Sequence, residues 1–73
     1  MDEVKQRVVD ELNELSERTS KLVKFTLSEK FSFLNTNMQY LMQDQIRAML
    51  EYGNILRKRL ACWDITEDIP SDR

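Results

Sequence analysis

Apolar residues recur at alternating steps of four and three along two long stretches of this chain. This spacing keeps one stripe of a helix facing a partner helix, so it predicts an all-α fold, an antiparallel helical hairpin. The first stripe consists of Val8, Leu12, Leu15, Thr19, Leu22 and Thr26. The second consists of Met38, Met42, Gln45, Met49, Tyr52, Leu56, Arg59 and Trp63. We expect Gln45 and Thr19 to fix the packing register, whereas Tyr52 and Arg59 raise the question of a second role.

The first helix is expected to run from about Glu3 to about Lys30, because neither proline nor glycine interrupts that range. Its acidic start and its later lysines suit the helix dipole. The apolar segment 31–34 loses the heptad rhythm. We therefore predict that this segment forms the hairpin turn, with its aromatic side chains packed back against the helices.

The second helix is expected to begin within the N-cap residues of segment 35–37, where Thr36 and Gln39 fit a capping box, and to end at about Trp63. Gly53 lies inside this helix and costs roughly 1 kcal/mol relative to alanine. Either it allows another backbone to approach closely, or a long helix simply tolerates it. We divide the chain into a hairpin domain, residues 1–63, and an acidic flexible tail, residues 64–73.

A hairpin within a chain of 73 residues cannot enclose a core of its own. The single cysteine, Cys62, excludes an intrachain disulfide, and with no histidine a zinc site would have a poor ligand set. Apolar residues also lie outside the two stripes: Val4, Val9, Val23, Phe25, Leu27, Leu41, Ile46, Leu50, Ile55 and Leu60. Because a hairpin needs only one apolar face per helix, this wider coverage predicts a homo-oligomer.

Composition disfavours several classes of function. Without histidine there is no Ser/His/Asp or Cys/His set, and one glycine cannot form a phosphate-binding loop, so we expect no enzyme and no cofactor. Cys62 lies beside Trp63 near the seam and is expected to be a small buried apolar group rather than a nucleophile. The net charge of −2 argues against binding a nucleic acid polymer. The acidic N-terminus and the lack of a long apolar run predict no secretory signal and no membrane span, and hence a cytoplasmic location.

Charge is unevenly placed along the chain. Residues 64–73 have a formal charge of −3, which leaves about +1 on the hairpin. Acidic residues crowd the start of the first helix, and Arg57, Lys58 and Arg59 crowd the end of the second. An antiparallel hairpin places these two ends side by side, so mutual charge complementarity is one explanation of the basic cluster.

A small anionic ligand is a second explanation for some of the cations, because it needs only a few of them with an aromatic surface. The candidate ligand-binding residues are Lys21, Arg7, Lys24, Arg59 and Tyr52. In an oligomer, neighbouring copies would bring such residues into one pocket. The alternatives stay open: Lys21 and Lys24 would instead lie on a solvated face, and Tyr52 would pack in the core with its hydroxyl at the rim.

The joint order of several motifs resembles a known family. The matching residues are Gln6-Arg7-Val8-Val9-Asp10-Glu11, Lys21-Leu22, Phe25, Phe31, Leu34, Leu41, Gln45, Met49, Tyr52, Leu56, Arg59-Leu60 and Trp63. They span about residues 6–63 and resemble the small phage hairpin proteins that antagonise CBASS, the cyclic-oligonucleotide-based bacterial defence system. These proteins form the second anti-CBASS family, called cyclic-nucleotide sponges.

The resemblance implies hairpins that interlock into a homohexamer and bind cyclic di- and trinucleotides, such as cyclic GMP-AMP, without cleaving them. In the cytoplasm of the infected bacterial host, the signal then never reaches its effector. The resemblance also implies a short N-terminal helix set off from the hairpin, with a break around residues 13–17.

The resemblance extends to particular site residues. Lys21 matches a family lysine of the dinucleotide pocket, and Arg59 matches an arginine that serves a separate site for larger rings. The family's base-stacking aromatic has no counterpart here, because Val4 and Lys5 occupy its place. A function of another class stays open, namely a helical adaptor or inhibitor that binds a host protein through the Met-rich second helix or the acidic tail.

Overall fold

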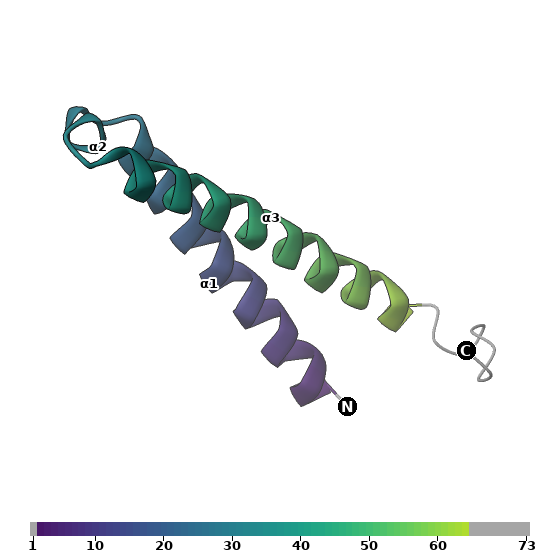
Figure 1. Ribbon diagram of the computed structural model, residues 1–73. Coiled ribbons are helices and arrows are strands. Elements are labelled where there is room, and N and C mark those ends of the chain that lie inside the picture. Colours follow the sequence, from purple (N-terminus) through teal and green to yellow (C-terminus); the bar gives the residue numbers. More distant parts are fainter. Residues whose placement is uncertain (1, 65–73) are drawn as a thin grey trace.

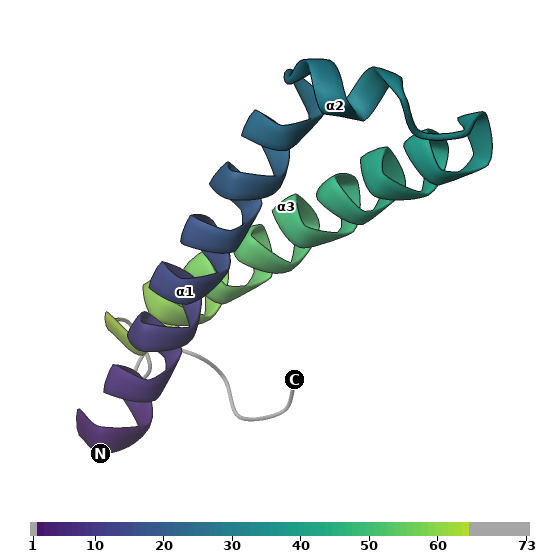
Figure 2. The same ribbon diagram turned by 90° about the vertical axis from the view of Figure 1, so that its left-hand side faces the viewer.

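Two long antiparallel helices joined by a short helical turn make up the fold, as the hairpin prediction required (Figure 1). The computed structural model describes residues 2–64, with helices α1 (Asp2–Thr26), α2 (Glu29–Ser32) and α3 (Thr36–Asp64). The start of α1 and the end of α3 lie at the same end of the hairpin in both views (Figure 2). Among the described residues, no helix is long and apolar enough to cross a membrane.

Helix α1 runs unbroken through residues 13–17, so the separate N-terminal helix implied by the family resemblance is not formed. Leu12 and Leu15 continue the apolar stripe on both sides of this point, and no glycine or proline interrupts it. A continuous heptad pattern without a helix-breaking residue leaves no reason for a break.

Helix α1 ends at Thr26, four residues before the expected end. The Thr26 hydroxyl donates a hydrogen bond to the carbonyl of Val23 (2.6 Å), and the Ser28 hydroxyl donates to the carbonyl of Phe25 (2.6 Å). The Ser28 amide donates to the same Phe25 carbonyl at 3.0 Å. Hydroxyls that bond to carbonyls of the preceding turn compete with the helical ladder, and tighter i→i+3 bonds then close the helix.

Segment 31–34, the predicted turn, falls partly within α2 and partly after it. Phe31 is buried and meets Phe25 edge-on, with 6.2 Å between ring centroids, so the prediction of an aromatic packed back on the helices is confirmed for Phe31. It is wrong for Phe33, which is 77% exposed.

Helix α3 begins with Asn35 as its N-cap rather than with the predicted capping box of Thr36 and Gln39. The Asn35 side-chain oxygen accepts a hydrogen bond from the Met38 amide at 2.8 Å, which satisfies one of the free amides of the first turn. The cluster of capping residues thus predicted where the helix starts but not which residue caps it.

Gln39 fastens the turn to α3. Its side-chain nitrogen donates to the carbonyls of Phe31 and Leu34, both at 3.0 Å. The capping-box prediction expected the Gln39 side chain to bond to a backbone N–H group at the start of α3. The side chain instead donates to two carbonyls of the turn between α1 and α3.

The predicted stripe of the first helix is confirmed. Val8, Leu15 and Thr19 are buried, and the other three members are partly buried. The Thr19 hydroxyl donates to the Leu15 carbonyl at 2.7 Å, so its burial leaves no unpaired hydroxyl. Val8 and Leu15 form a core with Leu56, which is 0% exposed, and Leu12, Met49, Leu60 and Trp63 pack against it.

The predicted stripe of the second helix is half right. The α3 residues that face the core are Met42, Ile46, Met49, Gly53, Leu56, Leu60 and Trp63, each buried or partly buried. Every second member of the prediction is confirmed, whereas Met38, Gln45, Tyr52 and Arg59 are exposed. Residues 42, 49, 56 and 63 belong to both the predicted stripe and the observed one. The observed stripe was harder to recognise in the sequence because Gly53 has no apolar side chain.

Gly53 packs against α1. A Cβ built on it would lie 3.7 Å from Leu15 Cδ2, 3.9 Å from Leu12 Cδ1 and 3.5 Å from Arg57 Nη1. These are ordinary van der Waals separations, so Gly53 lies at the helix–helix contact but leaves room for a methyl group.

Ion pairs between described residues join neighbours on one helix at two places. They are Arg18–Glu14 (Nη2 to Oε1, 3.9 Å) in α1 and Arg47–Asp44 (Nη1 to Oδ1, 2.8 Å) in α3. In the basic cluster, Arg57 donates to the side-chain oxygen of Asn54 at 3.3 Å. Charge complementarity between the two helix ends therefore stays a prediction. Asp64 is the last residue of α3, and the rest of the predicted tail lies outside the described residues.

Candidate functional site

A groove of about 420 Å³ lies between α1 and α3 on one flank of the hairpin. Its lining residues are Arg18, Lys21, Leu22, Phe25, Met42, Gln45 and Met49. The heptad pattern explains the composition, because core-facing residues form the floor and the residues beside them form the rim. Leu22, Met42 and Met49 are partly buried, whereas Arg18, Lys21 and Gln45 are exposed.

The rim of this groove is positively charged. Arg18 and Lys21 are three residues apart on α1, a spacing that places side chains side by side on a helix. Arg18 contacts Glu14 at 3.9 Å, but both side chains are about 70% exposed, and such surface pairs are weak and easily exchanged. Lys21 makes no ion pair with another described residue in the structure.

Two cations and an amide above an apolar floor suit a ligand that has both phosphate and an aromatic base. Guanidinium and ammonium groups form strong charge-assisted hydrogen bonds to phosphate oxygens. Methionine and phenylalanine offer a polarizable surface for a ring. The described residues contain no cluster of His, Cys, Asp or Glu that would hold a metal ion. The groove therefore has the chemistry of a binding site.

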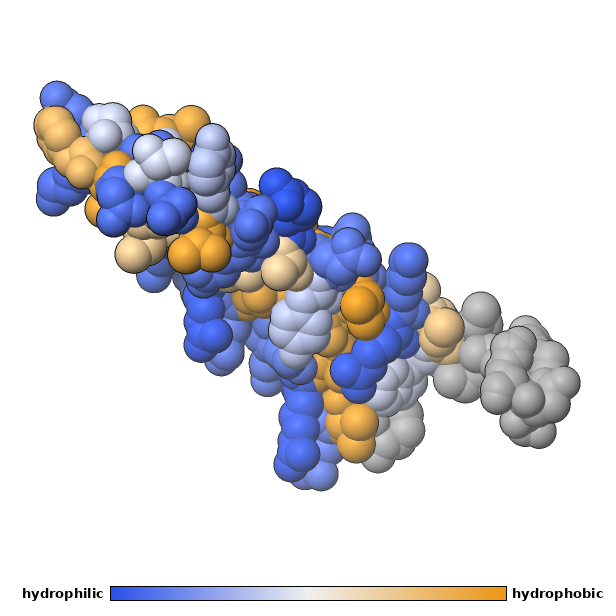
Figure 3. Space-filling model, in the orientation of Figure 1, coloured by the Kyte–Doolittle hydropathy of each residue, from blue (hydrophilic) through white to orange (hydrophobic). Residues whose placement is uncertain are grey.

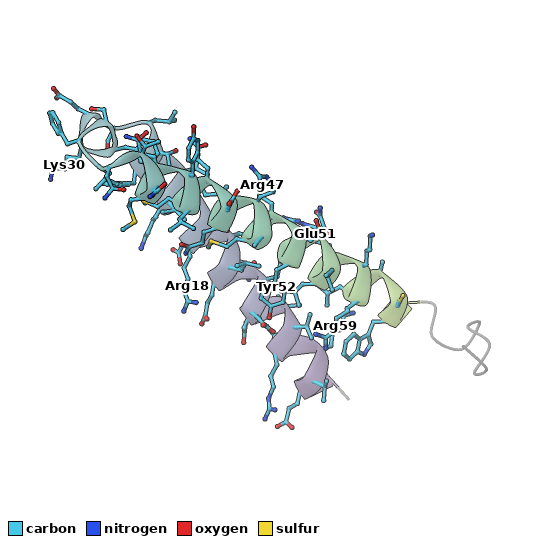
Figure 4. The ribbon with its side chains drawn as sticks, in the orientation of Figure 1. Arg18, Lys30, Arg47, Glu51, Tyr52 and Arg59 are labelled. Atoms are coloured by element: carbon cyan, nitrogen blue, oxygen red, sulfur yellow. The ribbon has the colours of Figure 1, made fainter. Side chains whose placement is uncertain are left out.

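Of the predicted ligand residues, only Lys21 lines this groove. Tyr52 and Arg59 lie on the same flank of α3, one and two heptads beyond Gln45, which is about 10 and 21 Å along the helix. Figure 4 shows both reaching toward α1, whereas Arg47 and Glu51 point away from it. Tyr52 is 40% exposed, so it does not pack in the core.

Arg59 lines a different hollow. This open hollow of about 440 Å³ lies on α3 near its C-terminal end, between Ile55, Lys58, Arg59, Cys62 and Trp63. Its two cations and its tryptophan repeat the chemistry of the first groove, but the lining comes from one helix. The Cys62 thiol there is exposed, which contradicts the expectation of a small apolar group near the seam.

The remaining two candidates lie apart from both sites. Arg7 is exposed on α1, two heptads or about 21 Å before Lys21. Lys24 is also exposed, and its helical position turns it away from α3. One hairpin thus does not bring the five predicted residues together, and their joint role in binding stays a prediction.

Arg18 and Gln45 are the polar groove residues that sequence reasoning missed as ligand contacts. The sequence did contain a signal for Arg18. Residues 18 and 25 lie next to core residue 22 on one side of α1, and this side faces the groove that Gln45 lines. Gln45 was interpreted as a packing residue because the predicted stripe of the second helix included it. Only when the residues of α3 that face the core are known does Gln45 become recognisable as a groove residue.

The fold and the groove define a small all-α binding protein, built as an antiparallel hairpin and without a recognisable catalytic set among its described residues. The model of the Sequestin family matches residues 2–62. The chain belongs to the Sequestin family, and this membership suggests that it sequesters a small signalling molecule rather than transforming it. Searches of curated proteins and of solved structures gave no match.

Proposed function

We propose that this protein sequesters a small phosphorylated nucleotide signal without cleaving it, and that the signal is a cyclic di- or trinucleotide such as cyclic GMP-AMP. Binding would keep the signal from its effector and so block CBASS defence in the cytoplasm of a phage-infected bacterium. The single observation that supports the ligand class is the groove in which Arg18 and Lys21 stand above an apolar floor. The cyclic nature of the ligand rests on the family resemblance given above.

Different groove residues are expected to contact the phosphates, the base edge and the base surface. Arg18 and Lys21 hold the phosphates, and Gln45 offers both a donor and an acceptor to a base edge. Met42, Met49 and Phe25 provide the surface under the base. The charged and polar contacts become stronger as water leaves the groove, because charges attract more strongly at a lower local dielectric.

Sequestration requires affinity and abundance, not chemistry. The lining of the groove includes no carboxylate, imidazole or thiol that could act as a general base or nucleophile. The Glu14 carboxylate on α1 pairs with Arg18 and does not line the groove. We therefore expect the nucleotide to leave the protein unchanged.

Calorimetric titration tests the proposal. The panel is cyclic GMP-AMP, cyclic tri-adenylate, guanosine tetraphosphate, a linear dinucleotide and a nucleoside diphosphate sugar. We expect a cyclic nucleotide to bind wild-type protein and Lys21→Ala to weaken that binding by about tenfold or more, the loss typical of one charged hydrogen bond. Lys30→Ala is the matched control, because this exposed lysine lies at the hairpin tip (Figure 4).

The panel distinguishes sequestration of a nucleotide in general from sequestration of a cyclic nucleotide in particular. Binding of only a linear member would contradict a cyclic ligand but support nucleotide sequestration. No heat with any member would contradict the proposal as a whole. Equal weakening by Lys21→Ala and Lys30→Ala would remove Lys21 from the site.

A helical adaptor or inhibitor of a host protein is the second candidate function. Leu27 is 82% exposed and Phe33 is 77% exposed, and both lie at the turn of the hairpin. Orange apolar residues also interrupt the blue surface along the hairpin in Figure 3. Capture of one host protein in equal molar amount from a lysate, abolished by Phe33→Ser and combined with no nucleotide binding, would favour this function.

A further inference from the structure

A second pocket lies between α1 and α3 on the flank opposite to the groove of Lys21. We call it the serine pocket, because Ser16 and Ser20 line it from α1; Gly53 and Arg57 line it from α3. Each of the two serines follows a buried residue of α1 by one position, whereas Arg18 and Lys21 each precede a residue that faces α3. Because one position is about 100° of helix, the two pairs lie on opposite sides of α1.

The serine pocket is smaller than the groove. Its volume is about 250 Å³, against about 420 Å³ for the groove. Sites for drug-sized ligands hold about 300 to 1,000 Å³, so the serine pocket suits a ligand smaller than a cyclic dinucleotide. Met49 lines both hollows and lies between them. The two hollows are therefore separate sites on one hairpin.

Arg57 is the charged residue of the serine pocket, and its own helix holds it in place. The Nη1 atom of Arg57 donates to the Asn54 side-chain oxygen at 3.3 Å. The same atom lies 3.5 Å from the position that a Cβ on Gly53 would take, so the guanidinium lies beside the one residue of α3 without a side chain. Arg57 makes no ion pair with another residue of the described range 2–64. A guanidinium has five N–H donors, and the bond to Asn54 leaves the others for a ligand.

The hydroxyl groups of Ser16 and Ser20 add donors from the other helix. The two residues are four positions apart, so their side chains are neighbours on the same side of α1. The hydroxyls of Thr19 and Thr26, also on α1, donate to carbonyls of the preceding turn. Ser16 and Ser20 differ, because neither hydroxyl bonds to another described residue. Both serines are exposed, so their hydroxyls can turn toward a ligand in the pocket.

The rest of the lining is apolar. Leu15 and Met49 belong to the contact between the helices, and Leu50 stands beside them with 54% of its surface exposed. No carboxylate lines the pocket, so the single positive charge of Arg57 is not cancelled within it. The pocket thus joins a set of anion donors to an apolar wall, and this combination suits an anion that has an organic part.

We propose that the serine pocket binds a small phosphate monoester, with its phosphate between Arg57 and the two serine hydroxyls and its organic part against Leu50 and Met49. A guanidinium binds two phosphate oxygens at once through parallel N–H groups. The third phosphate oxygen then accepts from the serines on α1. A carboxylate has only two oxygens and would leave the donors of one helix unused. This site does not depend on the proposed nucleotide binding.

Calorimetric titration with phenyl phosphate tests the ligand class, with inorganic phosphate and benzoate as comparisons. We expect the wild-type protein to bind phenyl phosphate more tightly than either of the others. Arg57→Gln should weaken this binding by about tenfold or more, the loss typical of one charged hydrogen bond. Lys58→Gln is the matched control, because it removes the same charge from the next residue, which is exposed and does not line the pocket. The double variant Ser16→Ala with Ser20→Ala should weaken binding several-fold.

Two further measurements locate the bound phenyl phosphate. Lys21→Ala should leave its affinity unchanged, because Lys21 lines the groove on the other flank. Gly53 is the single glycine of the chain, so its amide signal is easily assigned in an NMR spectrum. We expect phenyl phosphate to shift this signal in the wild-type protein and to leave it in place in Arg57→Gln.

Four results would overturn the proposal. The first is no binding of phenyl phosphate by the wild-type protein, and the second is equal weakening by Arg57→Gln and Lys58→Gln. The third is benzoate binding as tight as that of phenyl phosphate, which would contradict recognition of three phosphate oxygens. The fourth is binding lost in Lys21→Ala but kept in Arg57→Gln, which would place the ligand in the groove. Failure of cyclic GMP-AMP to bind contradicts the proposed function alone, since the serine pocket is tested with a different probe.

Discussion

Gly53→Ala should stabilise the protein, although Gly53 is buried between the two long helices. Alanine is favoured over glycine by about 1 kcal/mol in a helix interior. The added methyl would meet Leu15, Leu12 and Arg57 at 3.5 to 3.9 Å, with no closer contact. Burying one methyl group contributes up to about 0.8 kcal/mol more. We therefore expect a gain of roughly 1 to 2 kcal/mol in the free energy of unfolding.

Thermal unfolding followed by circular dichroism measures this gain. For a chain of this size, each kcal/mol raises Tm by about 4 to 8 °C. Both proteins must be compared at several equal concentrations, because self-association would make Tm depend on concentration. Gly53→Leu is the matched control, since a side chain of that size overpacks against Leu12 and Leu15 and should lower Tm. A lower Tm for Gly53→Ala would refute the inferred space at this contact.

Three further changes follow from the same packing and charges. Asn35→Ala removes the cap of α3 and should cost about 1 kcal/mol, measured by urea unfolding; no loss would mean that Asn35 is not the cap. Leu56→Ala removes a fully buried side chain and should cost about 2 to 5 kcal/mol in the same assay, whereas Leu50→Ala, at a side chain that is 54% exposed, should cost far less; equal costs would contradict the core. Raising NaCl from 50 to 500 mM should weaken nucleotide binding several-fold, because the cations of the groove are exposed; unchanged affinity by calorimetry would argue against phosphate recognition.

Much of the fold could be predicted from the sequence because heptad spacing is a strong signal. The first stripe was predicted correctly at every position, including Thr19, whose hydroxyl bonds to the Leu15 carbonyl. The second stripe was wrong at alternate positions. Gly53 interrupts the apolar pattern of the stripe that faces the core, and Gln45 was interpreted as a packing residue. The early end of α1 depends on hydroxyl bonds of Thr26 and Ser28 that no periodicity predicts.

The candidate site could be predicted only in part. Lys21 was identified, but Arg18 was missed. A residue at the rim of the groove can be recognised only when it is known which residues of the opposite helix face it. Apolar residues outside the two stripes predicted contact with other copies. Of these, Leu41, Leu50 and Ile55 are exposed on α3, whereas Ile46 and Leu60 are partly buried within the hairpin. Arg59 lines a separate hollow on α3, so one hairpin does not bring it to the groove of Lys21.

Native mass spectrometry with and without cyclic GMP-AMP tests the central claim most directly, because one spectrum reports assembly and ligand together. We predict an oligomer that gains the mass of intact nucleotide, a Lys21→Ala oligomer of equal size that gains much less, and recovery of uncleaved nucleotide after heating. An oligomer that never gains nucleotide mass, or that releases only a cleaved product, would contradict sequestration of this signal.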